Sequence, residues 1–214
     1  MKHKCKAFSL VEILLVIAII ALLAGLLFPV LASSKKSGQR GASTVELRQI
    51  GMAMLMYRED YSAFPETYGL DVLAESGYIT SPRIFLAPGD PVAGLAGKEL
   101  ACTKGITVKN PQSYSSVFTP GNHPWKEIEK VDNNAGILAT RIYGNRRSTF
   151  PGSAKTACDT YMWMFEGTLL RFRQDGSVQT AKFSLAPDTS VDGATETFKW
   201  YRMFTDEKTI WDQG

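Results

Sequence analysis

The residue that most restricts the chemistry of this chain is Glu12, a single carboxylate at the start of a long apolar segment. Residues 13–34 carry no charge, and no basic residue lies between Glu12 and Lys35. In a helix with a rise of ~1.5 Å per residue, ~20 apolar residues span a hydrocarbon core of ~30 Å, so the segment is predicted to cross a membrane. An ionised carboxylate is costly at the edge of such a helix, and we expect Glu12 to be paired with a cation or protonated.

Patterns for catalysis are sparse. His123 is the only histidine outside the first seven residues, and its neighbours Asn122 and Pro124 indicate a turn. A histidine-based triad would need a serine or cysteine and an acid brought in by the fold. The sequence has no G-x-x-x-x-G-K-[ST], H-E-x-x-H or C-x-x-C spacing, so it supports neither a nucleotide site nor a zinc site. We therefore do not expect an enzyme.

Residues 6–12 read Lys-Ala-Phe-Ser-Leu-Val-Glu. This segment resembles the prepilin cleavage and methylation motif, G-F-T-L-x-E, of type IV pilins and type II secretion pseudopilins. The resemblance implies that a membrane peptidase cuts between Ala7 and Phe8, that Phe8 is then N-methylated, and that Glu12 guides subunit assembly. Ala7 replaces the usual Gly, which could slow processing, and Ser9 replaces Thr.

The resemblance also implies a counterion for Glu12. Cleavage creates an α-amine on Phe8, which the Glu12 of an incoming subunit would bind. Within one chain the two groups lie ~6 Å apart along the helix, so an internal pair is also possible. An alternative interpretation is an ordinary acidic residue favoured by the helix dipole. Gly25 and Pro29 are expected to shape the helix, since many proteins of this family have a helix-bending proline at the position of Pro29.

A protein of this family is a structural subunit of a homo-oligomeric filament. It starts as a single-pass precursor in the inner membrane, in contact with lipid, with its globular part outside the cytoplasm. It then enters a periplasmic or extracellular filament, and its partners are the prepilin peptidase, an inner-membrane assembly platform and the ATPase of that platform. The sequence does not separate a pilus subunit from a pseudopilus subunit, or a major subunit from a minor one.

Two alternatives remain open. Lys2, Lys4 and Lys6 resemble the basic region of a secretory signal, and residues 30–32 resemble a signal cleavage site. The apolar run is longer than the ~7–15 residues of such signals. The second alternative is a membrane-anchored binding protein that forms no filaments.

Removal of the leader changes the charge and the cysteine count. Without the three leader lysines, Lys+Arg falls from 24 to 21, equal to the 21 acidic residues, so the remaining chain is formally neutral. Those lysines fit a cytoplasmic leader. Cys5 is lost with it, and Cys102 and Cys158 either form a disulfide that closes a loop of ~57 residues or remain two separate buried thiols.

Calcium and nucleic acid are weaker candidates. Some major pseudopilins hold calcium near the C-terminal sheet, and Asp175, Asp188 and Asp192 lie in turn-rich sequence. Three loosely spaced acids do not specify the six or more oxygens that Ca²⁺ needs, and Asp175-Gly176 is also a typical hairpin turn. Arg171 and Arg173 share one face of a predicted strand, which is typical of a solvated surface, and we do not expect nucleic acid binding.

The elements that position these residues follow from the apolar pattern. We expect a leader at residues 1–7, the membrane half of a long helix at 8–32, its exposed half at 33–64 and a globular domain at 65–214. Leu47, Ile50 and Met54 continue a helical stripe. A short helix that ends at Gly77 is expected within 70–79, a loop at 80–112 and strands at 113–118 and 136–143. Residues 161–183 are expected to form a three-stranded meander with turns at Glu166-Gly167 and Asp175-Gly176.

Together these elements predict an α+β fold, in which a long N-terminal helix packs on a C-terminal antiparallel sheet. The structure of residues 80–112 and 184–214 is left open by the sequence, and the final residues are either a strand or a packed tail.

Overall fold

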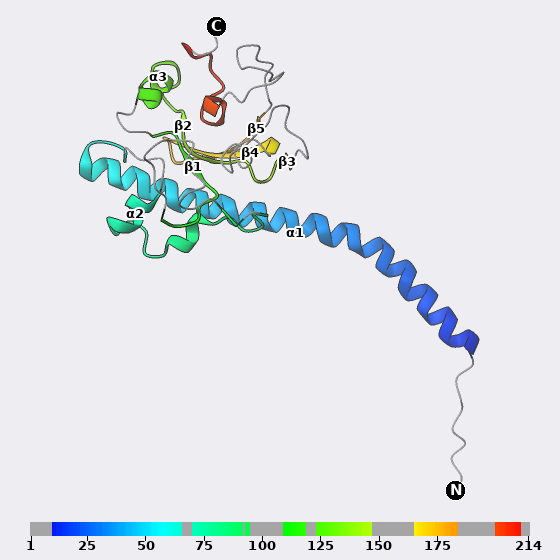
Figure 1. Cartoon of the computed structure of the whole chain (residues 1–214). Coiled ribbons are helices and arrows are strands. Elements are labelled where there is room, and N and C mark those ends of the chain that lie inside the picture. Colours follow the sequence, from blue (N-terminus) through cyan, green and yellow to red (C-terminus); the bar gives the residue numbers. More distant parts are fainter. Residues whose placement is uncertain are drawn as a thin grey trace, which may run out of the picture. The chain divides into compact units, whose positions relative to one another are not determined.

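The computed structural model describes residues 10–65, 70–91, 93–94, 109–118, 123–146, 165–183 and 200–210. The elements, labelled in Figure 1, are α1 (Leu10–Tyr61), α2 (Asp71–Glu75), the 3₁₀ helix η1 (Pro82–Phe85), β1 (Ser115–Ser116), α3 (His123–Val131), β2 (Gly136–Thr140), β3 (Asn145–Arg146), β4 (Phe165–Arg173), β5 (Val178–Phe183) and the 3₁₀ helix η3 (Trp200–Met203). The chain divides into two compact units between Gln39 and Arg40, and each is described by itself. Several predictions fall outside the described part: the leader at 1–7, the start of the meander at 161–164, and those about Ala7, Phe8, Cys102, Cys158, Asp188 and Asp192.

α1 is a single helix of 52 residues. Its N-terminal part consists of exposed apolar side chains. It is the one helix in the described part of the chain that is long and apolar enough to cross a membrane, judged by length and composition. The helix continues through Pro29, which has no N–H to donate to the preceding turn. The predicted long apolar helix is confirmed.

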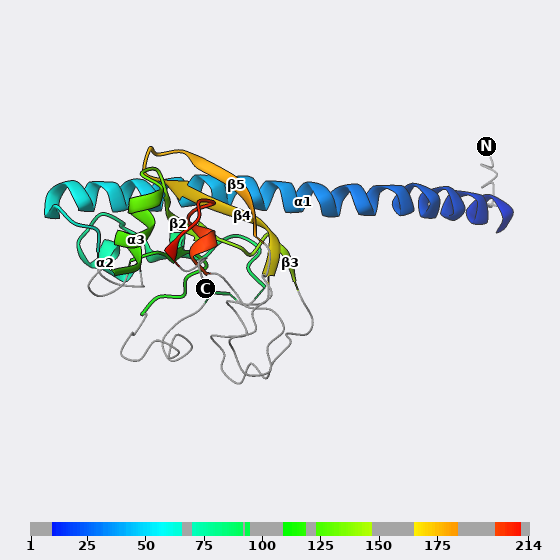
Figure 2. The same cartoon turned by 90° about the horizontal axis from the view of Figure 1, so that it is seen from above.

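In the second unit, α1 packs against the sheet. Its buried residues recur at helical spacing on one face, and they are Ser43, Leu47, Ile50, Gly51, Ala53 and Met54. A Cβ at position 51 would lie 2.2 Å from the ring of Phe172 on β4, so only glycine permits this approach. Viewed from above, β4 and β5 lie over this part of α1 (Figure 2).

β4 is the central strand, and all pairings among the described strands are antiparallel. It pairs with β2, with β3 and with β5, while β1 pairs with β2. Leu169, Leu170 and Phe172 are all buried, because both faces of β4 are covered. The predicted α+β layout, with a long N-terminal helix on a C-terminal antiparallel sheet, is confirmed.

The C-terminal segment around η3 covers the face of the sheet away from α1 (Figure 1). The backbone N–H of Gly136 on β2 donates to the carbonyl of Phe204 at 2.7 Å. Tyr201, Met203 and Phe204 are buried. Of the two alternatives for this part of the chain, the described residues 200–210 form a packed tail.

Three expectations about the sheet and its surroundings were wrong. Glu166-Gly167 is not a hairpin turn but lies inside β4, where Gly167 has a φ of +98° that glycine adopts without strain. His123 does not lie in a turn, because it begins α3, and the adjacent Pro124 suits a first helical turn. Arg171 is not solvated, because it is 3% exposed and its guanidinium pairs with Asp206 of the C-terminal segment.

Candidate functional site

Glu12 lies in the first turn of α1 and is exposed. A carboxylate at this position is favoured by the partial positive charge at the helix N-terminus. Phe8, four positions earlier in the sequence, lies outside the described residues. Glu12 is thus the acidic group at the start of an apolar helix, as the sequence indicates.

Gly25 and Pro29 lie inside the uninterrupted apolar part of α1. A Cβ on Gly25 would meet no atom within 4 Å, so this glycine is not required by packing within the chain. Glycine lets two helix backbones approach closely, which is a common feature of helix pairs in membranes. The space beside Gly25 is therefore open to another helix.

A buried hydrogen-bond chain attaches α1 to the globular unit. Ser43 Oγ lies 2.6 Å from the hydroxyl of Tyr143, which donates its own proton to the carbonyl of Pro88 at 2.9 Å. Ser43 is therefore the donor in the first contact. The guanidinium of Arg40 lies 6.0 Å from the centre of the Tyr143 ring. This chain joins one face of α1 to a loop that is distant in the sequence.

A second contact is made one turn further along α1. The Tyr114 hydroxyl donates to Glu46 Oε2 at 2.7 Å. Burial raises the pKa of Glu46, and the hydrogen bond from Tyr114 opposes that shift. Burial likewise raises the pKa of Tyr114 and of Tyr143. Sequence reasoning missed Ser43 and Glu46, although their spacing of three residues beside Leu47 places polar groups next to the buried stripe.

Asp175, the one calcium candidate within the described residues, has other contacts. Its carboxylate accepts from the Ser177 N–H at 2.8 Å and from Asn134 Nδ2 at 2.6 Å. The side-chain hydrogen bond of Ser177 contributes most, followed by that of its backbone N–H and that of Asn134, and together they lower the pKa of Asp175 to about 2. Its oxygens link the β4–β5 turn to the segment that precedes β2.

No group of three or more metal-binding side chains occurs within residues 10–65, 70–91, 93–94, 109–118, 123–146, 165–183 and 200–210. The other two calcium candidates, Asp188 and Asp192, lie outside the described residues, as do Cys102 and Cys158, so a calcium site and a disulfide stay untested. His123 is the first residue of α3.

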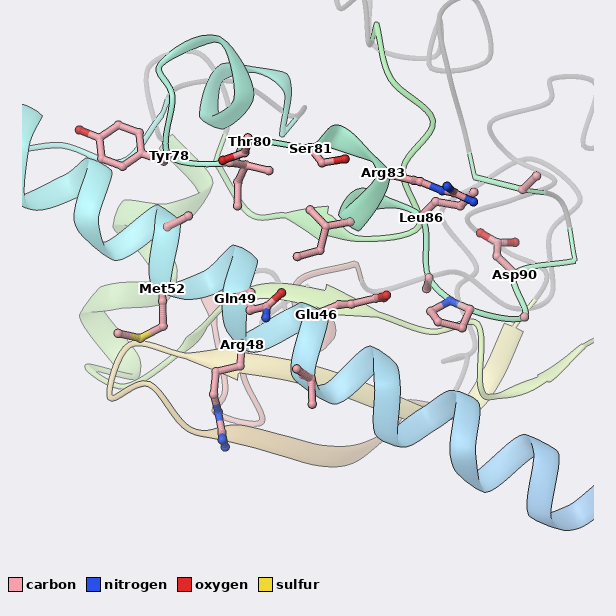
Figure 3. A pocket seen from close by; sticks show the side chains of 18 of the residues that line it. Glu46, Arg48, Gln49, Met52, Tyr78, Thr80, Ser81, Arg83, Leu86 and Asp90 are labelled. Carbon is pink, nitrogen blue, oxygen red and sulfur yellow. The ribbon is translucent and has the colours of Figure 1, made fainter.

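A groove of about 1190 Å³ runs between α1 and the segment from Tyr78 to Asp90 (Figure 3). Its α1 wall includes Val45, Gln49, Met52 and Met56, and the opposite wall includes Thr80, Ile84 and Leu86. Arg48 extends away from the opposite wall.

The groove ends near a polar contact between its two walls. Tyr78 donates its hydroxyl proton to Asp60 on α1, and this hydrogen bond raises the pKa of Tyr78 to about 12. Tyr78 also packs edge-on against Tyr57. The groove was not foreseen from the sequence, because its two walls come from different segments.

Comparison with known proteins gives one match. Residues 2–28 match the family model described as the prokaryotic N-terminal methylation motif. Neither a curated protein nor a solved structure matches the chain. The match includes Glu12 and α1 as far as residue 28, and it does not extend to the globular unit. By this motif and the helix that follows it, the chain carries the N-terminal signature of type IV pilin and pseudopilin precursors.

Proposed function

We propose that this chain is the precursor of a structural subunit in a type IV pilus-like or type II secretion pseudopilus filament. The observation that carries the proposal is the match to the methylation motif at residues 2–28, which includes the exposed apolar start of α1. A leader peptide, a cleavage site and an exposed apolar helix are what such a subunit needs for insertion, processing and bundling.

In this proposal the prepilin peptidase cuts between Ala7 and Phe8 and methylates the new amine of Phe8. The Glu12 carboxylate of an incoming subunit then pairs with that amine on a subunit already assembled. Each charge offsets the other in apolar surroundings, where an isolated charge is costly. Electrostatic pairing of this kind selects the register in which the helix of a new subunit docks.

The precursor waits in the inner membrane, with the globular unit outside the cytoplasm. Extraction removes ~20 apolar residues from lipid, which is tolerable only when neighbouring helices replace the lipid. The energy comes from the ATPase of an inner-membrane platform, because the sequence has no nucleotide-binding pattern. The role of the chain itself is structural and not catalytic.

Glu12→Ala tests the proposal in cells that contain the native assembly machinery. We expect the variant to insert in the membrane and to lose filaments, measured by electron microscopy of sheared cell-surface and periplasmic fractions. Glu129→Ala, on the exposed face of α3, is the matched control and should assemble normally. Mass spectrometry of the mature N-terminus should find methylated Phe8 in the unsubstituted protein.

Each alternative function gives a different result. A membrane-anchored binding protein tolerates Glu12→Ala and keeps its leader, so its intact mass includes residues 1–7. A secreted protein begins near Ser33. The proposal is overturned by an intact mass that includes residues 1–7, by a mature N-terminus near Ser33, or by normal filaments from the Glu12→Ala variant.

A further inference from the structure

Three methionines alternate along α1, at positions 52, 54 and 56, and their exposure to solvent differs. A step of two residues corresponds to ~200° around a helix, so Met54 faces away from Met52 and Met56, which share one face. Met54 is 0% exposed, whereas Met52 is 45% and Met56 is 56% exposed. The helix thus carries one protected thioether between two that are open to solvent.

The two exposed thioethers lie where a small reagent can reach them. Both methionines line the groove of about 1190 Å³ between α1 and the segment from Tyr78 to Asp90. The turn between β4 and β5 approaches Met52 at Gly176, where a Cβ would lie 3.9 Å from the Sδ atom. Because glycine has no Cβ, the turn leaves this side of the sulfur uncovered.

We propose that Met52 and Met56 form a reversible oxidation site for peroxides. The sulfur attacks the O–O bond of hydrogen peroxide and takes up one oxygen atom, and the other oxygen leaves as water. The sulfur loses two electrons and becomes a sulfoxide. In the reverse direction a methionine sulfoxide reductase uses two thiols, which become a disulfide, and releases the oxygen as water.

Oxidation changes the chemical character of the groove. A thioether is apolar and a weak acceptor, whereas a sulfoxide is polar. On the α1 wall the large exposed apolar side chains are Val45, Met52 and Met56, so two sulfoxides make most of this wall polar. Burial of a polar group without a hydrogen-bond partner is costly.

The consequence for assembly rests on the proposed filament function, because it requires that assembly removes the groove from water. A subunit with sulfoxides at positions 52 and 56 then enters the filament less readily than a reduced subunit. Reduction of the sulfoxides restores the apolar wall. Oxidants outside the cytoplasm thereby regulate how many subunits are competent to assemble.

Peptide mapping tests the oxidation site on the full chain in detergent. Trypsin cleaves after Arg48 and Arg58, so all three methionines are released in one peptide, residues 49–58. After limited treatment with hydrogen peroxide, fragment ions should show sulfoxide at positions 52 and 56. Oxidation at position 54 should be slower by about tenfold or more, because the oxidant reaches Met54 only after local opening of the fold.

Unfolding provides the control for intrinsic reactivity. In urea the three methionines lose their different surroundings and should react at equal rates. Equal rates in the folded chain overturn the oxidation site. A preference for positions 52 and 56 that persists in urea overturns it as well, because the preference then does not come from the fold.

The effect on assembly is tested with subunits that are oxidised before assembly begins. Cells contain the unsubstituted chain and a differently tagged Met52→Leu/Met56→Leu chain, whose leucines are similar in volume but have no sulfur. The ATPase of the platform is induced only after the peroxide has been removed, so burial in a filament cannot protect the methionines.

Chains with sulfoxide at position 52 or 56 should be depleted in the filaments, relative to the membrane fraction, by about fivefold or more, as expected for burial of an unpartnered polar group. The chain with both leucines should assemble equally well with and without peroxide. Met54→Leu is the matched control, and this chain should remain as sensitive to peroxide as the unsubstituted chain.

The outcomes separate this inference from the proposed function. Filaments that contain the sulfoxides in the same proportion as the membrane fraction overturn the regulation and leave the filament function intact. A loss of the double-leucine chain equal to that of the unsubstituted chain also overturns the regulation. If untreated subunits are inserted and processed but form no filaments, the proposed function and the effect on assembly both fail, whereas the peptide map still tests the oxidation site.

Discussion

At the scale of single residues, two carboxylates on α1 have different surroundings and different roles. Glu12 begins an uncharged, exposed part of the helix, where its proposed partner is an amine of another subunit. Glu46 is half-buried beside Tyr114, whose hydroxyl donates to it, and it helps to attach the helix to its own globular unit. We thus propose that one carboxylate acts between subunits, whereas the other contacts a tyrosine of its own globular unit.

The buried carboxylate predicts a pH dependence of stability. Because burial raises the pKa of Glu46 in the folded chain, the folded state binds its proton more tightly than the unfolded state. Its contribution to stability is complete below the unfolded pKa of about 4.3 and declines as the pH rises through the folded pKa. We expect Glu46→Gln to remove that decline, measured by urea unfolding of the full chain in detergent between pH 4 and 7.

Tyr114→Phe is the companion variant for this measurement. Loss of its hydrogen bond removes the interaction that lowers the pKa of Glu46, so the decline should extend to higher pH. If the two variants and the unsubstituted chain have parallel pH profiles, Glu46 does not titrate with folding.

At the scale of elements, the main contact in the globular unit is that of α1 with β4. Gly51 allows the helix to lie against the ring of Phe172, and Ser43 and Glu46 add polar contacts at one end of the same face. The other face of β4 is covered by the C-terminal segment, where Arg171 pairs with Asp206, and Arg171 also donates to Gln179 on the neighbouring strand β5. Both faces of the central strand are thus closed to water.

The contact at Gly51 predicts a clear effect of one methyl group. A Cβ at this position would lie 2.2 Å from Phe172, so Gly51→Ala should force α1 and β4 apart and destabilise the fold by about 1–3 kcal/mol or more. Gly41→Ala is the matched control, because a Cβ there meets nothing within 4 Å. It should be neutral or stabilising by up to about 1 kcal/mol. Urea unfolding of the full chain in detergent measures both, and equal stabilities would contradict the packing argument.

At the scale of the whole molecule, the two units of the chain have different surroundings. Residues 10–32 of the first unit form an apolar helix with exposed side chains, whereas the unit from Arg40 onward has its own core. An exposed apolar helix is stable only in lipid or against other helices. A membrane and a helical filament both provide such surroundings. In the proposed function, the subunit therefore moves from the first to the second.

Membrane orientation provides a test at this scale. Protease added to intact spheroplasts should digest the globular unit and leave a protected fragment of about 30 residues, the length that spans a bilayer with its flanks. Alkaline carbonate should not release the full chain before digestion. A cytoplasmic marker protein serves as the control for intact spheroplasts. Protection of the globular unit would place it in the cytoplasm and contradict the proposed topology.

The local parts of this protein could be predicted from the sequence because each depends on neighbours in the chain. The uncharged run after Glu12 specifies an apolar helix by length alone, and the spacing of Leu47, Ile50 and Met54 identifies its buried face. Residues 6–12 indicate the processing motif, which the family comparison supports. Within the sheet, the same local reasoning failed at Glu166-Gly167, because the pair Glu-Gly occurs both in hairpin turns and inside strands. The residue types alone do not distinguish the two positions.

The tertiary structure decided whatever depends on partners distant in the chain. The alternation of arginines with apolar residues along β4 is typical of a strand with one solvated face. Arg171 is buried only because the C-terminal segment that contains Asp206 packs over it. Tyr143 and Tyr114 reach α1 from about 70–100 residues away, so nothing near Ser43 or Glu46 in the sequence indicates them. The groove beside Met52 and Met56 exists because α1 and the segment from Tyr78 to Asp90 come together in space. Apolar periodicity determines which face of a helix avoids water, whereas long-range packing decides which groups meet that face.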